Sequence, residues 1–340
     1  MTILLYAGVF LASVIITLAG CHLFTNGIEW LGKRLNISEG AVGSVFAAVG
    51  TTLPETSIPI IAIFFGAGRE QAEVGLGAIL GAPFMLSTLV LPILAFLLLL
   101  YARIGKRAAT FKLNYGDVRV DIIFFLIAYV LALTCAVIPS RMFHAAVAIV
   151  LIGLYVYYMK LKFAADDEGS EESVGGDALE PLLFARKSPR PSYVVIAAQG
   201  LVGLLGLVGG AHLFVTAANS ISAEMQVSPL ILALLIAPLA TELPEMSNSF
   251  LWLYRKKDRL AVGNVTGAMV FQGMVPVSVG LLGTEWVLGT TALATMVLAV
   301  FAMGVNLLQV LWSGQWRPWL LSASAILYLG YTVFLYTHGS

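Results

Sequence analysis

Long apolar stretches follow one another along almost the whole of this chain, and each is close to the length that crosses a lipid bilayer. A transmembrane helix needs about 20 predominantly apolar residues, and a helix satisfies its backbone polar groups inside the hydrocarbon. With 59% hydrophobic and 11% charged residues, a soluble domain would carry more apolar surface than it could bury. The sequence therefore predicts an all-α integral membrane protein with ten transmembrane helices, at residues 2–24, 42–66, 72–101, 119–137, 143–162, 193–217, 229–254, 260–284, 287–309 and 317–337.

The basic residues divide unequally between the two sets of loops that these ten helices create. Of the 19 Lys and Arg residues, all except Arg69 and Arg141 fall in loops or helix edges on one side. Cytoplasmic loops carry the excess of Lys and Arg, so this side is predicted to be the cytoplasm. We expect a multi-pass protein of the cell (inner) membrane with both termini on the non-cytoplasmic side. The formal net charge is +0, and we expect the lipid bilayer and no nucleic acid as a partner.

A sequence repeat relates the two halves of the chain. Residues 20–24 (GCHLF) match residues 210–214 (GAHLF), and the same spacing along the chain also pairs Glu55 with Glu245. Each half contains five predicted helices, an odd number, so the second copy enters the membrane from the opposite side. This pattern predicts two inverted five-helix repeats, an architecture typical of secondary transporters.

The connector between the two repeats is the one clearly polar stretch. Residues 164–192 are rich in Asp, Glu, Gly and Ser, a composition that indicates disorder. We therefore divide the chain into a first repeat at 1–163, an acidic cytoplasmic linker at 164–192 and a second repeat at 193–340.

Each half also carries the motif Leu-Pro-Glu inside an apolar stretch, at residues 53–55 and 243–245. A carboxylate at membrane depth costs several kcal/mol and is rarely present without a function. Proline removes a helical hydrogen bond at the same place and frees carbonyl oxygens. The motifs therefore predict Pro-broken helices at the midplane, where Glu55 and Glu245 with freed carbonyls form a cation site.

The sequence around these motifs resembles a known family. Residues 50–55 (GTTLPE) and 240–245 (ATELPE) are similar to the two alpha-repeat signatures of the cation/calcium antiporter superfamily, which includes the sodium/calcium exchangers. Residues 263–267 (GNVTG) resemble the glycine-rich start of the helix that follows the second signature. The resemblance implies a secondary active antiporter, not an enzyme, that exchanges a divalent cation for H⁺ or Na⁺ by alternating access.

The same resemblance implies a set of ion ligands. Glu55 and Glu245 would bridge a central divalent cation, and Thr51 and Thr241 would add hydroxyl or backbone oxygens. Ligands that are all oxygen suit a hard cation, so Ca²⁺ is the favoured substrate, with Mg²⁺ or Mn²⁺ as alternatives. The ions are substrates, and no resident cofactor is expected.

The chain departs from the family pattern at the positions that usually supply polar ligands after each signature. Ala82, Leu86 and Ala268 are apolar, and only Gln272 can offer an oxygen. Glu242 adds a third acid, which would retain or exchange a proton beside other carboxylates or else face a water-filled entry path. We therefore add Glu242 and Gln272 to the candidate ligands. The departures favour H⁺ over Na⁺ as the counter-ion, and both remain open.

The sequence also bears on two other classes of function. A membrane enzyme is disfavoured, because the sequence has no His-Glu-x-x-His pair, no Gly-x-Ser-x-Gly turn and no phosphate-binding glycine loop. A passive cation channel is the main alternative to an antiporter, since acidic residues also line channels.

Overall fold

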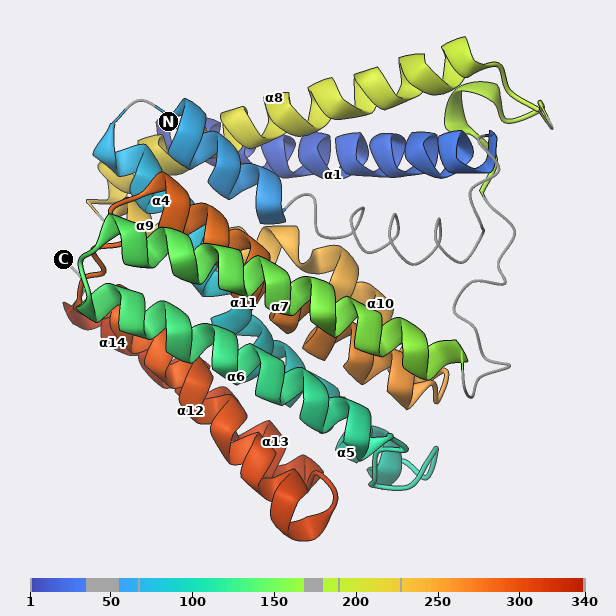
Figure 1. Ribbon diagram of the computed structural model, residues 1–340, viewed down its shortest axis with the longest axis vertical. Coiled ribbons are helices and arrows are strands. Elements are labelled where there is room, and N and C mark those ends of the chain that lie inside the picture. The colour runs from blue at the N-terminus through green and yellow to red at the C-terminus, as the bar shows by residue number, and fades with distance from the viewer. Residues whose placement is uncertain are drawn as a thin grey trace.

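The computed structural model describes residues 2–34, 55–66, 68–167, 180–188, 190–226 and 228–338, and within these residues it contains helices and no strand. A short helix, Glu55–Phe65, precedes α4 and ends in a π-helical turn, and a second π-helical turn, Leu86–Val90, joins α4 to α5. The helices are α1 (Thr2–Arg34), α4 (Arg69–Met85), α5 (Leu91–Arg103), α6 (Tyr115–Val137), α7 (Arg141–Asp167), α8 (Tyr193–Met225), α9 (Pro229–Thr241), α10 (Leu243–Tyr254), α11 (Asp258–Gly283), α12 (Thr290–Ser313), α13 (Pro318–Ala323) and α14 (Ala325–His338) (Figure 1).

Eight helical stretches in the described part of the chain are long and apolar enough to cross a membrane. The predicted all-helical membrane fold is confirmed by these stretches, which are Leu4–Ile28, Arg69–Arg103, Tyr115–Val137, Arg141–Lys162, Tyr193–Met225, Asp258–Gly283, Thr290–Ser313 and Pro318–Leu335. Each matches one of the predicted helices. The count of ten, the inverted arrangement and the division into two repeats remain predictions.

The other two predicted helices contain the Leu-Pro-Glu motifs. The stretch 229–254 is divided into α9 and α10, with Glu242 between them, so the break expected beside Pro244 is present. The stretch 42–66 is described only from Glu55 onward, and Pro54 lies outside the described residues.

Helices α1 and α8 lie side by side along much of their length (Figure 1). Glycines allow their backbones to touch: a Cβ on Gly203 would lie 2.8 Å from the Cα of Phe24, and one on Gly210 would lie 2.7 Å from the backbone nitrogen of Thr17. Gly203 in α8 meets Phe24 in α1, and Gly210 further along α8 meets Thr17 earlier in α1, so the two helices are antiparallel. The two copies of the repeated sequence around Gly20 and Gly210 therefore lie in one antiparallel pair of helices.

Helix α4 packs closely against α9, the helix that ends at the break. A Cβ on Gly77 would lie 2.6 Å from the carbonyl oxygen of Leu230, and one on Gly81 would lie 2.9 Å from the Cα of Leu234. Small residues four apart allow this approach between apolar helices. The packing fixes the direction in which α9 carries Thr241 and Glu242.

Helix α11 is the most enclosed of the eight spans, with 72% of its most apolar window buried, against 61% or less in the others. It contacts α6 and α7 on one side and α10 on another. The hydroxyl of Ser278 donates to the carbonyl of Ala148 in α7 at 3.2 Å, which adds a polar tie to the apolar packing. The polar side chains of Thr266, Gln272 and Ser278 in α11 are buried, so they face protein and not lipid.

The start of α1 and the end of α14 lie at the same end of the bundle (Figure 1). Helices α1, α5, α7 and α10 finish at the opposite end, where most of the described Lys and Arg residues also lie. We call this opposite end the basic end. The positive-inside rule predicts that it faces the cytoplasm.

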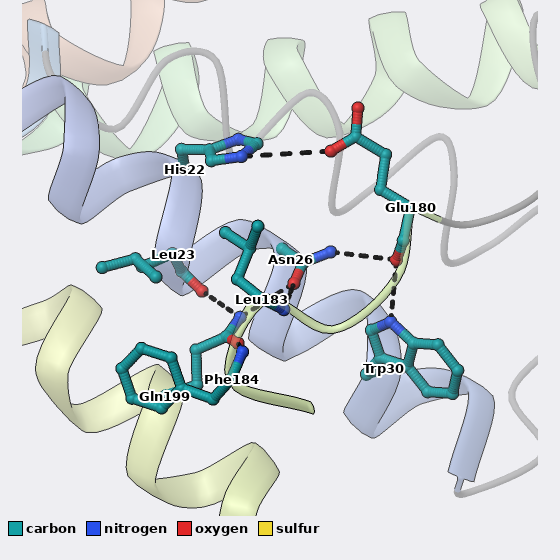
Figure 2. Close-up of polar contacts among 8 residues, drawn as sticks. All are labelled: His22, Leu23, Asn26, Trp30, Glu180, Leu183, Phe184 and Gln199. Atoms are coloured by element: carbon teal, nitrogen blue, oxygen red, sulfur yellow. Dashed lines mark hydrogen bonds and ion pairs between the residues drawn. The ribbon is translucent and has the colours of Figure 1, made fainter. Parts of the chain in front are cut away.

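The last part of the predicted linker, residues 180–188, packs against α1 and α8 (Figure 2). The side chains of Asn26 and Trp30 in α1 both donate to the carbonyl of Glu180, at 3.2 and 2.9 Å. Gln199 in α8 donates to Oδ1 of Asn26 at 2.8 Å and accepts from a backbone N–H of the segment at 2.9 Å. Polar side chains of the two helices thus satisfy the backbone of a segment whose composition indicates disorder.

Candidate functional site

The break between α9 and α10 places one acidic side chain inside the protein. The N–H of Glu242 donates to the carbonyl of Pro238 at 2.9 Å, and the carbonyl of Glu242 accepts from the N–H of Met246 at 2.9 Å. The chain therefore turns at Glu242 while keeping these two helical hydrogen bonds, and Pro244 removes the one that Ala240 would otherwise accept. The Glu242 side chain is fully buried, and Thr241 beside it is 6% exposed.

Gln272 lies in the middle of α11 and meets this break. Its side chain is 1% exposed, and its Nε2 donates a hydrogen bond to Oε1 of Glu242. Its Oε1 has no hydrogen-bond partner among the described residues. A buried amide oxygen of this kind is a suitable ligand for a hard cation.

A proline lies one turn after each of two candidate residues. Pro276 lies four residues after Gln272 inside α11, and Pro59 lies four residues after Glu55 inside the short helix. Proline has no N–H, so neither carbonyl has its usual helical donor. The spacing of four residues between each candidate and its proline is visible in the sequence, but the predicted helix breaks rested on Pro54 and Pro244 alone.

The other candidate residues are Glu55, Glu245 and Thr51. Glu55 begins the described helix Glu55–Phe65, and its side chain is 6% exposed. Glu245 lies in the first turn of α10, but its side chain lies outside the described part of the chain, as does the whole of Thr51. Glu242 and Gln272 are brought into contact, with Thr241 next to them. The pairing of Glu55 with Glu245 stays a prediction.

The described side chains contain no group of three or more His, Cys, Asp and Glu residues close enough to hold a metal. The predicted ligand set would not form such a group among these side chains, because it relies on Glu245 and on amide, hydroxyl and backbone oxygens. In the described part of the chain, the candidate site consists of the buried carboxyl group of Glu242, which accepts a hydrogen bond from the amide of Gln272 at a helix break.

A second buried acidic residue, Asp121, contacts α11 at Thr266. It is not among the candidate residues predicted from the sequence. Asp121 in α6 is 2% exposed and accepts a hydrogen bond from the hydroxyl of Thr266 in α11 at 2.6 Å. Tyr158 in α7 donates to it at 3.0 Å, and the ammonium of Lys162 lies 2.6 Å away. The carboxylate is thus neutralised and fully used in joining three helices, which indicates a structural role. An acid within the apolar stretch 119–137 was the available signal.

A second buried ion pair fixes the entry to α11 at the basic end. The guanidinium of Arg107 contacts Oδ2 of Asp258 at 2.5 Å, and both side chains are almost fully buried. The same oxygen accepts from the backbone N–H of Lys112 at 2.8 Å. The loop after α5 is thereby attached to the start of α11.

Comparison with known proteins places this architecture in a family. The family model described as sodium/calcium exchanger protein matches residues 5–164 and 195–337. The putative antiporter CaxA of Alkalimonas amylolytica is 25% identical over 278 residues, which cover 79% of this chain and 78% of the relative. An uncharacterized membrane protein of Methanocaldococcus jannaschii, MJ0091, is 24% identical over 271 residues, with 79% and 78% covered.

Two solved structures share the fold. The crystal structure of the H⁺/Ca²⁺ exchanger CAX matches with a TM-score of 0.64 at 15% identity, covering 98% of this chain and 88% of that one. The sodium-calcium exchanger NCX_Mj, soaked with Na⁺ and Sr²⁺, matches with a TM-score of 0.53 at 21% identity, covering 96% and 99%.

Proposed function

Because the chain belongs to the sodium/calcium exchanger protein family, a family of cation/calcium antiporters, we propose that it exchanges Ca²⁺ for H⁺ or Na⁺ across the membrane. The observation that carries this proposal is the buried contact between Glu242 and Gln272 at the break between α9 and α10. An acid and an amide at a helix break inside an apolar protein are the parts that a cation site needs.

The proposed substrate site comprises Glu55 and Glu245 as the bridging carboxylates, with oxygens from Thr51, Thr241 and Gln272. Support comes from burial, since Glu55 and Thr241 are each 6% exposed and Gln272 is 1% exposed. Bare carboxylates in such surroundings are costly, and one divalent cation neutralises two of them. Gln272 would contribute its side-chain oxygen and also its backbone carbonyl oxygen, which lacks its usual helical donor because of Pro276.

We favour H⁺ as the counter-ion. The positions where family members place polar ligands are occupied here by Ala82, Leu86 and Ala268, which are 3%, 0% and 9% exposed and offer no side-chain oxygen. Fewer oxygens are then left to coordinate Na⁺. Glu242 is the proposed proton-carrying group, because a third buried acid beside two carboxylates exchanges protons when a divalent cation arrives.

Strict exchange follows from the cost of the empty site. With its carboxylates unneutralised in a low-dielectric interior, the site is least stable when it holds neither cation nor protons. Only the loaded protein then alternates readily between the two sides of the membrane, by movement of one group of helices against another. A passive channel would lack this coupling.

The test is transport into sealed proteoliposomes. Radiolabelled Ca²⁺ is supplied at equal concentration on both sides, and a pH gradient or a Na⁺ gradient is then imposed in separate experiments. We expect Ca²⁺ to accumulate above its equilibrium distribution under at least one gradient. Ca²⁺ that only equilibrates would identify a channel, and no Ca²⁺ flux under either gradient would overturn the proposal. Competition by Mg²⁺ or Mn²⁺ in the same vesicles ranks the divalent substrates.

Variants connect the flux to the site. Glu55→Gln and Glu245→Gln keep size and hydrogen bonding while removing charge, so both should abolish exchange in folded protein. Glu70→Gln is the control, because Glu70 is an exposed residue at the start of α4. Glu242→Gln should reduce H⁺-driven exchange more than Na⁺-driven exchange, since it removes the proposed proton carrier. Unchanged H⁺-driven exchange in this variant would assign the proton to another group.

A further inference from the structure

A cavity at the basic end of the bundle lies apart from the break between α9 and α10. It has a volume of about 280 Å³ and is lined by Tyr101, Lys106, Arg107, Tyr254 and Lys256. These residues come from the end of α5 and the loop after it, and from the end of α10 and the loop after that. We propose that this cavity binds a phosphate group, and that an anionic lipid headgroup supplies it.

Positive charge dominates the lining of the cavity. Lys106 lies over the ring of Tyr254, 5.5 Å from its centroid, and among the described residues neither Lys106 nor Lys256 forms an ion pair with a carboxylate. Of the lining cations, only Arg107 is neutralised, by Asp258. Two ammonium groups therefore remain for an anion.

Arg107 also lines the cavity, and its side chain is fixed in one orientation. One terminal nitrogen donates to the carbonyl of Leu253 at 3.0 Å and the other to Asp258 at 2.5 Å, so the guanidinium is held in one orientation. Its side chain is 7% exposed, yet its Nε–H has no acceptor among the described residues. Buried donors are normally satisfied, and a phosphate oxygen is the acceptor that a guanidinium suits best.

The backbone at Lys256 is a second unusual feature of the cavity. Lys256 has φ of 62°, in the left-handed region, and ends α10 with its N–H donating to the carbonyl of Leu253 at 3.1 Å. Glycine usually occupies this position after a helix, because it has no Cβ to clash. Lys256 thus carries its charge on the turn that follows α10, at the lining of the cavity.

The surroundings favour a lipid as the source of the phosphate. Tyr101 and Tyr254 meet edge to face, with their ring centroids 5.9 Å apart, and Tyr254 is 58% exposed. Earlier in α5, Phe96 and Leu100 are 57% and 41% exposed, as expected for side chains that face lipid tails. Tyrosine is enriched at the membrane interface, and basic pockets between transmembrane helices at this depth hold anionic headgroups.

The experiment measures binding to the full chain in detergent micelles. Short-chain phosphatidylglycerol, short-chain phosphatidylcholine and inorganic phosphate are titrated separately, and retained lipid is counted by native mass spectrometry. The test variant combines Lys106→Gln with Lys256→Gly, because glycine removes the second charge while accepting the left-handed backbone. Lys257→Gln is the matched control, an exposed lysine of the same loop that does not line the cavity.

We expect saturable binding of phosphatidylglycerol and weaker binding of phosphatidylcholine. Each lysine removed should weaken phosphatidylglycerol binding about fivefold, so the double variant loses about 25-fold while the control changes less than twofold. Competition by inorganic phosphate would support the phosphate chemistry. Binding of phosphate without binding of the lipid would overturn the lipid source, and equal lipid binding by wild type and the double variant would overturn the site.

Discussion

The side-chain amide of Gln272 donates a hydrogen bond to Oε1 of Glu242, and this contact ties the most buried helix to the break between α9 and α10. Both side chains are almost completely excluded from solvent. We therefore expect a change in the charge of Glu242, on binding a cation or a proton, to alter this contact with α11.

Replacing Gln272 by leucine should impair transport. The variant Gln272→Leu removes the donor to Glu242 and the free amide oxygen, and the loss of a buried hydrogen-bond donor costs about 1–3 kcal/mol. We expect Ca²⁺ exchange to fall by about tenfold or more, measured as the initial rate of uptake in proteoliposomes. Gln315→Leu, in an exposed loop, is the control. A wild-type rate in Gln272→Leu would remove Gln272 from the site.

Neighbouring glycines in α8 should respond differently to alanine. A Cβ on Gly210 would lie 2.7 Å from the backbone nitrogen of Thr17 in α1, whereas a Cβ on Gly209 would meet nothing within 4 Å. Gly210→Ala should therefore destabilise the protein by about 1–3 kcal/mol, because the two backbones must separate. Gly209→Ala should be neutral or slightly stabilising. Thermal unfolding in detergent compares them, and equal unfolding temperatures would contradict the close packing of α1 and α8.

Asp121 should contribute to stability more than to transport specificity. Asp121→Asn removes the charge that Lys162 neutralises and weakens the hydrogen bonds from Tyr158 and Thr266. We expect a loss of about 2 kcal/mol, less than for a fully buried pair because the Lys162 side chain is 29% exposed and can turn to solvent. Asp117→Asn, one turn earlier in α6 at an exposed position, should cost less than about 1 kcal/mol. The test is chemical denaturation, and a stable Asp121→Asn variant with altered ion preference would reassign Asp121 to the transport path.

The pair between Arg107 and Asp258 should behave as a buried ion pair. Asp258→Asn leaves an uncompensated guanidinium that is 7% exposed, which should cost about 3–5 kcal/mol. The double variant Arg107→Met with Asp258→Leu removes both charges and should recover most of that loss. The free energies of unfolding of Asp258→Asn and of the double variant, each compared with wild type, test this expectation. If the single variant were as stable as wild type, the pair would contribute nothing to the position of α11.

The membrane-spanning helices could be predicted because the bilayer imposes a length and an apolar composition that are visible in any stretch of about 20 residues. The break at Glu242 was also predictable, since Pro244 removes a helical donor at a known position. Most of the helix order therefore depends on local features. Contacts between helices that are far apart in the sequence do not depend on such local features.

The contact of Gln272 with Glu242 shows what the sequence lacks. The two residues are 30 positions apart, and the apolar pattern of α11 does not indicate which of its faces meets the break. The partners of Asp121 were hidden for the same reason, because Tyr158 and Thr266 belong to two other helices. The packed segment 180–188 was missed because composition reports a preference for solvent but not the particular acceptors and donors of Asn26 and Gln199.

The most direct measurement is anomalous scattering from Ca²⁺ in crystals of the protein, recorded at long wavelength. If Glu55 and Glu245 hold one substrate ion between the two halves, a single peak should lie about 2.3–2.6 Å from a carboxylate oxygen of each. A Ca²⁺ peak elsewhere, or two carboxylates pointing away from each other toward lipid, would contradict the proposed site.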